Sequence, residues 1–161
     1  MFPARLITKA EDLLDAYRRA GLTIATAESC TGGLIAGCLT EIPGASDVVE
    51  RGFLTYSNEA KHDLLGVPMA LIRAHGAVSA EVAEAMAAGA LERSAADAVV
   101  SATGIAGPGG ATADKPVGLV YLGAARRGLA RLHQRHVFAG DRGAVRLAAV
   151  EAALDLLRRV L

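Results

Sequence analysis

The sequence predicts an α/β fold: a three-layer α/β/α sandwich with a mixed, mostly parallel sheet and one antiparallel hairpin. Short strand-like runs alternate with longer segments whose apolar residues recur at helical spacing. Two later strand-like runs are separated only by a short turn. The 161 residues, 52% of them hydrophobic, suffice for one domain with an adequate core, and we expect no second domain.

The first third of the chain predicts two helices and two strands. Apolar residues recur at helical spacing from Leu6 to Tyr17, and Gly21 supplies a natural helix end. Thr23 to Ala27 form a short strand-like run, and a second amphipathic helix follows it closely. Pro43-Gly44 then break the chain before a second strand, predicted from Gly52 to Tyr56.

The middle third predicts three helices and a central strand. A helix over 58–66 begins with the capping residue Asn58 and ends with a glycine. A shorter helix over 68–76 opens with proline, and an alanine-rich helix over 79–92 opens with a serine cap. The run 98–102 is apolar enough for the centre of a sheet.

The last third predicts the hairpin and a final helix. Residues 118–125 and 130–138 form its two strands around a turn at Arg126-Arg127-Gly128. The final helix begins near Asp141, whose carboxylate suits an N-cap. We interpret the arginines of the hairpin as a solvated strand face; they are Arg126, Arg127, Arg131 and Arg135.

Three unusual stretches each follow a predicted strand. They are Ala27 to Gly33, Thr55 to Lys61, and a glycine-rich run from Thr103 that continues to Lys115. Ligands of α/β sheets bind beyond the carboxyl ends of the strands. We therefore expect the three stretches to form one site at one edge of the sheet.

Ser29 is the candidate nucleophile of this site. A strand that turns through small residues into a helix leaves backbone N–H groups unpaired, and those of Cys30 to Gly33 are placed to stabilise an oxyanion or phosphate. A serine in this position is also a common helix cap, so position alone leaves both interpretations open. Lys61 favours catalysis, because a desolvated lysine can accept the serine proton whereas arginine cannot.

Cys30 is a competing nucleophile, because a thiol at a helix N-terminus gains thiolate character. Its usual partner would be a histidine. His133 and His136 are three residues apart on a predicted strand and point to opposite faces, and His62 points away from Lys61 on its helix. Packing is the alternative interpretation of Cys30.

The glycine-rich run lacks the spacing of a Walker loop. No G-x-G-x-x-G motif fits either, because position 112 is threonine and not glycine. Its backbone N–H groups, with Thr112 and Lys115 nearby, form a nest that suits a phosphate or carboxylate. The acids are scattered and no Cys/His cluster is present, so we predict neither a metal nor a cofactor.

Composition excludes several classes of function. The net charge is zero and only 4% of residues are aromatic, which argues against a nucleic-acid partner. No apolar run is long enough to span a bilayer, and the N-terminus lacks the features of a signal peptide. The two cysteines, Cys30 and Cys38, do not indicate a disulfide framework. We expect a soluble cytoplasmic protein.

The three stretches, with Leu65-Gly66-Val67, Gly76-Ala77-Val78-Ser79 and Lys115-Pro116-Val117-Gly118, occur in an order that resembles the CinA C-terminal domain family. The resemblance covers nearly the whole chain. It implies a three-layer α/β/α fold, a homodimer, and hydrolysis of nicotinamide mononucleotide to nicotinate mononucleotide and ammonia. In many relatives the domain follows a larger N-terminal domain that this sequence lacks, so functions that need that domain are not implied.

The resemblance also implies roles for single residues. Ser29 attacks the carboxamide, Lys61 is its base, and Tyr56 assists proton transfer or positions the lysine. Arg142 pairs with the phosphate. The implied substrate-binding residues are Cys30, Thr31, Gly32, Gly33, Asn58, Thr103, Gly104, Ile105, Ala106, Gly107, Gly109, Gly110, Thr112, Lys115 and Arg142.

Two alternatives to the serine amidase stay open. The chain can be a non-catalytic, nucleotide-binding accessory domain of the competence or damage-inducible type. It can also be a cysteine hydrolase that uses Cys30.

Overall fold

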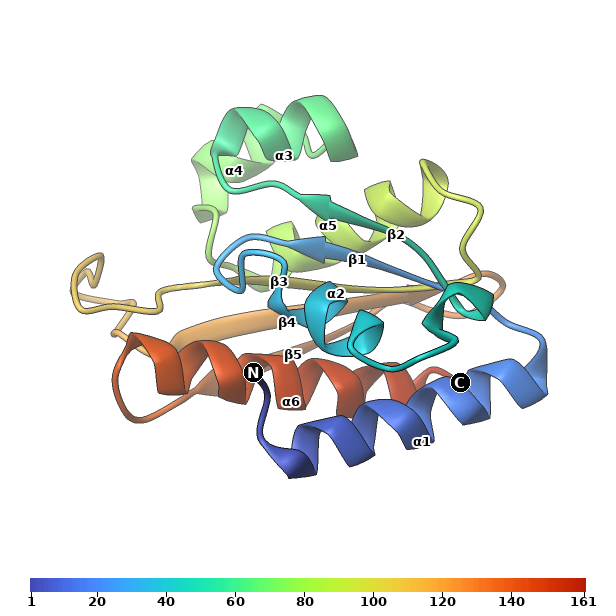
Figure 1. The fold of residues 1–161 in the computed structure, drawn as a ribbon. Coiled ribbons are helices and arrows are strands. Elements are labelled where there is room, and N and C mark those ends of the chain that lie inside the picture. Colours follow the sequence, from blue (N-terminus) through green and yellow to red (C-terminus); the bar gives the residue numbers. More distant parts are fainter.

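The computed structural model describes residues 1–161 and has a five-stranded sheet between two layers of helices (Figure 1). The strands are β1 (Ile24–Glu28), β2 (Val49–Leu54), β3 (Ala98–Gly104), β4 (Leu119–Arg126) and β5 (Leu132–Val137). The helices are α1 (Ala4–Ala20), α2 (Leu34–Thr40), α3 (Asn58–Leu65), α4 (Met69–His75), α5 (Ala80–Glu92) and α6 (Arg142–Arg159), with a 3-10 turn, η1 (Ala45–Asp47).

The sheet has the strand order β2-β1-β3-β4-β5. The strand β1 is parallel to both β2 and the central strand β3, whereas β4 is antiparallel to β3 and to β5. Thus β4 alone runs against the other strands, and β4 and β5 form the hairpin. These findings confirm the predicted mixed, mostly parallel sheet.

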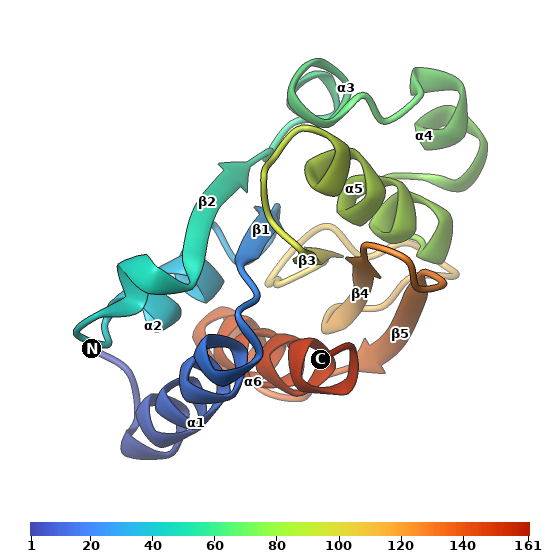
Figure 2. The same ribbon diagram turned by 90° about the vertical axis from the view of Figure 1, so that its right-hand side faces the viewer.

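Figure 2 shows α1, α2 and α6 on one face of the sheet and α3, α4 and α5 on the other. A separate hydrophobic core lies under each layer of helices. The larger core lies under α1, α2 and α6 and includes Leu14, Ile35 and Leu154, all buried. The smaller core lies under α3, α4 and α5 and includes Leu65 and Met86. Burial of aliphatic side chains on both faces explains why β1 and β3 contain almost no exposed residue.

The parallel strands place the three unusual stretches together, as expected. The carboxyl ends of β1, β2 and β3 lie at the same edge of the sheet, and α6 begins at that edge as well (Figure 1). The loops after the three strands and the first turns of α6 therefore surround one region.

The bounds of the second strand and the cap of α3 differ from the prediction. The second strand spans Val49–Leu54 and not 52–56, because its pairing with β1 begins at Val49, opposite Ile24, and ends where Leu54 lies opposite Glu28. The cap of α3 is Ser57 and not Asn58: Ser57 is extended, and its hydroxyl accepts a hydrogen bond from the Ala60 N–H at 3.0 Å.

The hairpin arginines do not all form a solvated face. Arg127 donates to the carbonyls of Leu91 in the last turn of α5 and of Ser94 and Ala96 after it. Arg126 donates to the carbonyls of Val160 and Leu161 at the C-terminus. Arg131 and Arg135 are exposed, in agreement with the prediction. No helix in the structure has both the length and the apolar composition needed to cross a membrane.

Candidate active site

In the turn after β1, the two backbone N–H groups directly after Ser29 have no backbone acceptor; Cys30 is 6% exposed and Thr31 is fully buried. The Ser29 N–H donates to the Ala102 carbonyl on β3, and the Gly32 N–H closes the turn onto the Ser29 carbonyl at 3.0 Å. The Gly33 N–H donates to the Glu28 carboxylate at 3.1 Å. The N–H groups of Cys30 and Thr31 donate no hydrogen bond within the chain. Two of the four predicted anion-binding donors are thus free.

The Glu28 side chain takes the place of a ligand at the start of α2. It is 1% exposed, and its carboxylate accepts hydrogen bonds from the N–H groups of Gly33, Ile35 and Ala36. The Thr26 and Thr31 hydroxyls also donate to it. A carboxylate at a helix N-terminus is electrostatically favourable, so Glu28 fixes the turn that carries Ser29.

Ser29 and Lys61 form a buried pair. The Lys61 Nζ lies 3.0 Å from the Ser29 Oγ, although Ser29 is in the turn after β1 and Lys61 is on α3. Lys61 is 1% exposed and Ser29 is 8% exposed. Lys61 reaches the serine because the Ser57 cap starts α3 just after β2, which places Lys61 in the first turns of the helix. The distance is one across which a proton can pass directly.

Burial lowers the pKa of Lys61, because removal from water penalises the charged ammonium. The Coulombic influence of Cys30 and Glu59 acts in the opposite direction and raises that pKa. The Lys61 Nζ also donates to the carbonyls of Thr55 at 3.0 Å and Tyr56 at 3.2 Å. These carbonyls hold the amine in place whether or not it carries the additional proton.

The serine and the lysine line a cavity of about 270 Å³. The loops after all three parallel strands and the start of α6 contribute to it, so the structure brings the three stretches together. The predicted site residues that line the cavity are Ser29, Cys30, Tyr56, Asn58, Lys61, Thr103, Gly104, Ile105, Ala106, Gly107, Gly109, Gly110 and Arg142.

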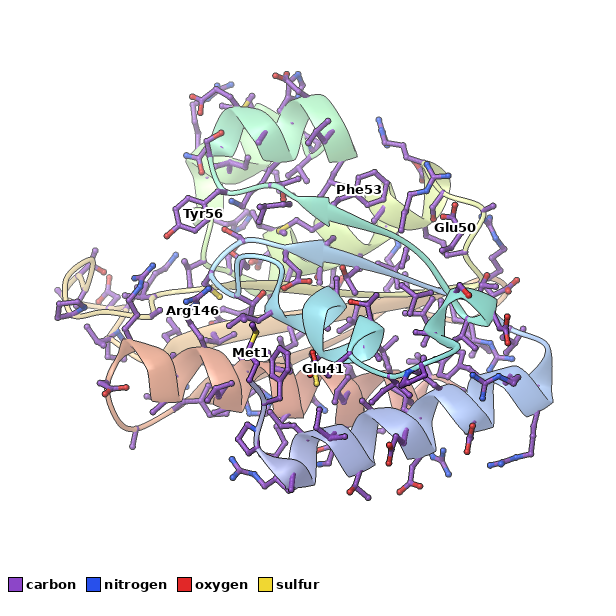
Figure 3. All side chains as sticks on the ribbon, viewed as in Figure 1. Met1, Glu41, Glu50, Phe53, Tyr56 and Arg146 are labelled. Atoms are coloured by element: carbon purple, nitrogen blue, oxygen red, sulfur yellow. The ribbon has the colours of Figure 1, made fainter.

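Arg142 connects two walls of this cavity. Its guanidinium donates to the Gly107 carbonyl at 2.8 Å and to the Tyr56 hydroxyl at 3.1 Å. Tyr56 lies on the loop between β2 and α3 and is 61% exposed (Figure 3). The phenol thus contacts Arg142, and Tyr56 contacts Lys61 through its backbone carbonyl.

The glycine-rich loop supplies a second group of free donors. The N–H groups of Ala106, Gly107, Gly109 and Gly110 donate no hydrogen bond within the chain. Thr103 is buried, and its hydroxyl donates to the Ala77 carbonyl at 2.8 Å, so it ties this loop to the segment after α4. The free N–H groups and the Arg142 cation suit an anionic ligand.

Five predicted substrate-binding residues do not line the cavity; they are Thr31, Gly32, Gly33, Thr112 and Lys115. Lys115 donates instead to the His75 carbonyl at 2.7 Å, at the end of α4. A cation is favourable at a helix C-terminus, which accounts for this position. Thr112 accepts a hydrogen bond from the Lys115 N–H and shapes the turn between them.

Cys30 lies in an environment that disfavours thiolate. Burial raises the pKa of its thiol to about 11, and the nearby Glu28 carboxylate adds to the increase. The helix N-terminus that was expected to acidify the thiol is occupied by Glu28. The geometry therefore favours Ser29 over Cys30 as the nucleophile.

Sequence reasoning missed four residues of the site. Ala77 and Val78 line the cavity, and Glu28 and Arg146 hold the serine turn. Ala77 and Val78 stand in one of the motifs that carried the family resemblance, which was the available signal. No sequence signal pointed to Arg146, because it lies more than 100 residues from the turn that it contacts.

Residues 7–161 match the sequence profile of the CinA C-terminal domain. The CinA-like protein of Citrifermentans bemidjiense is 54% identical over 144 residues, which cover 89% of this chain and 34% of the relative. The CinA-like protein of Mycolicibacterium paratuberculosis is 52% identical over 161 residues, covering 96% of this chain and 36% of the relative. The chain thus spans about a third of the length of these curated relatives.

Two solved structures have nearly the same fold. The competence/damage inducible protein CihA from Agrobacterium tumefaciens has a TM-score of 0.97 and 48% identity, with 99% of this chain and 98% of that chain covered. A competence-damaged protein (CinA) superfamily protein from Escherichia coli has a TM-score of 0.93 and 32% identity, with 100% and 94% covered. The chain belongs to the CinA C-terminal domain family.

Proposed function

We propose that the chain is an amidohydrolase that converts nicotinamide mononucleotide to nicotinate mononucleotide and ammonia. The observation that carries the proposal is the buried Ser29–Lys61 pair, with Oγ and Nζ 3.0 Å apart on the wall of a cavity of about 270 Å³. The resemblance of the sequence motifs to the CinA C-terminal domain family supports this choice of substrate.

The first half of the proposed reaction forms an ester. The neutral Lys61 amine accepts the Ser29 hydroxyl proton while Oγ attacks the carboxamide carbon, so that the carbonyl oxygen becomes an oxyanion. The intermediate collapses, the carbon–nitrogen bond breaks, and Lys61 returns the proton to the leaving nitrogen. Ammonia departs and the nicotinoyl group remains on Ser29.

The free N–H group of Cys30 is the proposed oxyanion donor. It directly follows the nucleophile on the cavity wall and donates to no backbone carbonyl, whereas Thr31 is fully buried away from the cavity. Fixed donors of this kind stabilise charge that develops only in the transition state, and loss of one typically costs about 100-fold or more in kcat. Glu28 keeps the turn in the required shape.

The second half returns the enzyme to its starting state. A water molecule attacks the ester carbon and Lys61 accepts a proton from it. When the second tetrahedral intermediate collapses, the carbon–Oγ bond breaks and Lys61 protonates Ser29. Nicotinate mononucleotide leaves, and the sum of both halves is amide plus water giving acid plus ammonia.

A nucleotide substrate is supported by the opposite wall of the cavity. The Arg142 guanidinium and the free N–H groups of the loop from Ala106 to Gly110 suit a phosphate dianion. Binding of the phosphate there would hold the pyridine carboxamide toward Ser29. Binding energy from a remote group is then used to orient the reacting one.

The test is ammonia release from purified protein with nicotinamide mononucleotide, together with chromatography of the nucleotide product. Wild type and Cys30→Ala are expected to be active, and Ser29→Ala is expected to be inactive while it still binds the nucleotide. If Cys30→Ala alone loses activity, the nucleophile is the cysteine. If wild type binds the nucleotide without turnover, the chain is an accessory binding domain. The implied homodimer stays a prediction, which light scattering measures.

A further inference from the structure

Arg146 binds the serine turn, the segment from Ser29 to Gly33 that follows β1. The carbonyls of Cys30 and Thr31 both accept from one guanidinium, that of Arg146 on α6: Nε lies 3.2 Å from the Cys30 oxygen and Nη2 lies 2.9 Å from the Thr31 oxygen. Figure 3 shows Arg146 between α6 and the turn after β1. Arg146 forms no ion pair with a carboxylate, and its side chain donates only to these two carbonyls.

The turn is shaped to receive this guanidinium. Gly32 has a φ of +61°, a region that side chains rarely adopt, and a Cβ there would lie 3.0 Å from the Arg146 Nη2. A residue larger than glycine would strain the backbone and crowd the guanidinium. The glycine thus permits the close approach of Arg146.

The planarity of the peptide bond links these contacts to the oxyanion donor. In a trans peptide the C=O and the following N–H point in opposite directions. The Thr31 carbonyl points at Arg146, so the Gly32 N–H points away from it, toward the Ser29 carbonyl that it binds. Because the Ser29 carbonyl points at Gly32, the Cys30 N–H points away from Gly32. Arg146 therefore fixes the direction of the free Cys30 donor through the closed turn.

We infer that Arg146 is a positioning residue that, through the closed turn, aims the Cys30 N–H group at the oxyanion of the reaction. This inference rests on the proposed serine amidase function and assigns Arg146 a role beyond the steps of that reaction. The cation contributes in a second way, because it withdraws electron density from the two carbonyls to which it is bound.

The test compares Arg146→Met and Arg146→Lys with wild type. Arg158→Met is the matched control, because Arg158 is also an α6 arginine that donates to a backbone carbonyl, that of Asp12, at the far end of the helix. For Arg146→Met we expect kcat to fall about 100-fold with KM within about twofold, as for loss of an oxyanion donor. Arg146→Lys, which restores the charge without the two-pronged geometry, should recover part of the loss. Arg158→Met should match wild type.

A second measurement is independent of the natural substrate. A fluorophosphonate forms an Oγ–P bond with an activated serine and releases fluoride, and its phosphoryl oxygen occupies the oxyanion position. The rate of Ser29 labelling should fall in parallel with kcat in Arg146→Met, whereas the affinity for nicotinate mononucleotide and the midpoint of the acid limb of the pH–rate profile should stay unchanged. Simple loosening of the fold would change all of these together.

The outcomes separate this inference from the proposed function. Labelling and turnover of Arg146→Met at wild-type rates would overturn the role of Arg146 and leave the amidase function intact. Wild type that is labelled at Ser29 without releasing ammonia would overturn the substrate, and the labelling rates would then decide the role of Arg146. If Arg146→Met does not fold, Arg146→Lys with wild-type labelling and turnover would overturn the inference.

Discussion

Replacement of Glu28 by glutamine tests how the fold holds its nucleophile. The carboxylate is 1% exposed and accepts five hydrogen bonds, three on Oε2 and two on Oε1. Glutamine keeps the size of the side chain but turns one of the two acceptors into an NH2 donor. With the amide oxygen at the Oε2 position, the NH2 group faces the Ala36 N–H, which loses its acceptor.

The magnitude follows from this geometry. An unsatisfied buried N–H costs about 1–3 kcal/mol, and each of the three hydrogen bonds at the Oε2 position loses roughly 1 kcal/mol when its acceptor is no longer charged. We therefore expect the free energy of unfolding to fall by about 4–6 kcal/mol, a large part of the roughly 5–15 kcal/mol that such a domain has.

Urea denaturation followed by circular dichroism measures the change. Glu92→Gln is the matched control, because that side chain is 70% exposed and its nearest cation, Arg93, is 3.7 Å away. The control should stay within about 0.5 kcal/mol of wild type. A loss below about 1 kcal/mol in Glu28→Gln would refute the view that this carboxylate fixes the start of α2 and the serine turn.

Further predictions concern the base and the substrate. Because burial lowers the pKa of Lys61 and only the neutral amine accepts a proton, kcat/KM should rise with pH on its acid limb, and Lys61→Arg should be as inactive as Lys61→Ala. The unfolded chain binds more protons than the folded one between the folded pKa of Lys61 and its unfolded value near 10.4, so in that window the unfolding free energy of wild type should rise with pH relative to Lys61→Met. Removal of the substrate phosphate should lower kcat/KM about 100-fold, or about 3 kcal/mol, which steady-state kinetics with the nucleotide and its riboside measures. Arg142→Ala should raise KM for the nucleotide and leave kinetics with the riboside nearly unchanged.

Local sequence signals predicted the fold class and most helix and strand positions. The alternation of strand-like and helical patterns, with Gly21, Ser79 and Asp141 at helix ends, needed no knowledge of distant contacts. The end of β2 and the Ser57 cap could not be decided in this way. Serine and asparagine are comparable caps, and the length of β2 depends on its register with β1.

The candidate site was likewise predictable from the sequence only in part. That Ser29, Lys61 and the glycine-rich loop share one cavity follows from parallel strands, which sequence reasoning could infer. The occupation of the helix N-terminus by Glu28 and the clamp by Arg146 depend on where side chains of separate elements meet. No periodicity or motif contains that information, so the number of free donors in the turn was overestimated.

The covalent intermediate tests the central claim most directly. Wild-type protein mixed with nicotinamide mononucleotide, quenched in acid within one turnover and digested, can be analysed by mass spectrometry. The account predicts a nicotinoyl mononucleotide ester on the peptide that contains Ser29, located on the serine itself and absent from Ser29→Ala. An adduct on Cys30, or turnover by Ser29→Ala at the wild-type rate, would contradict it.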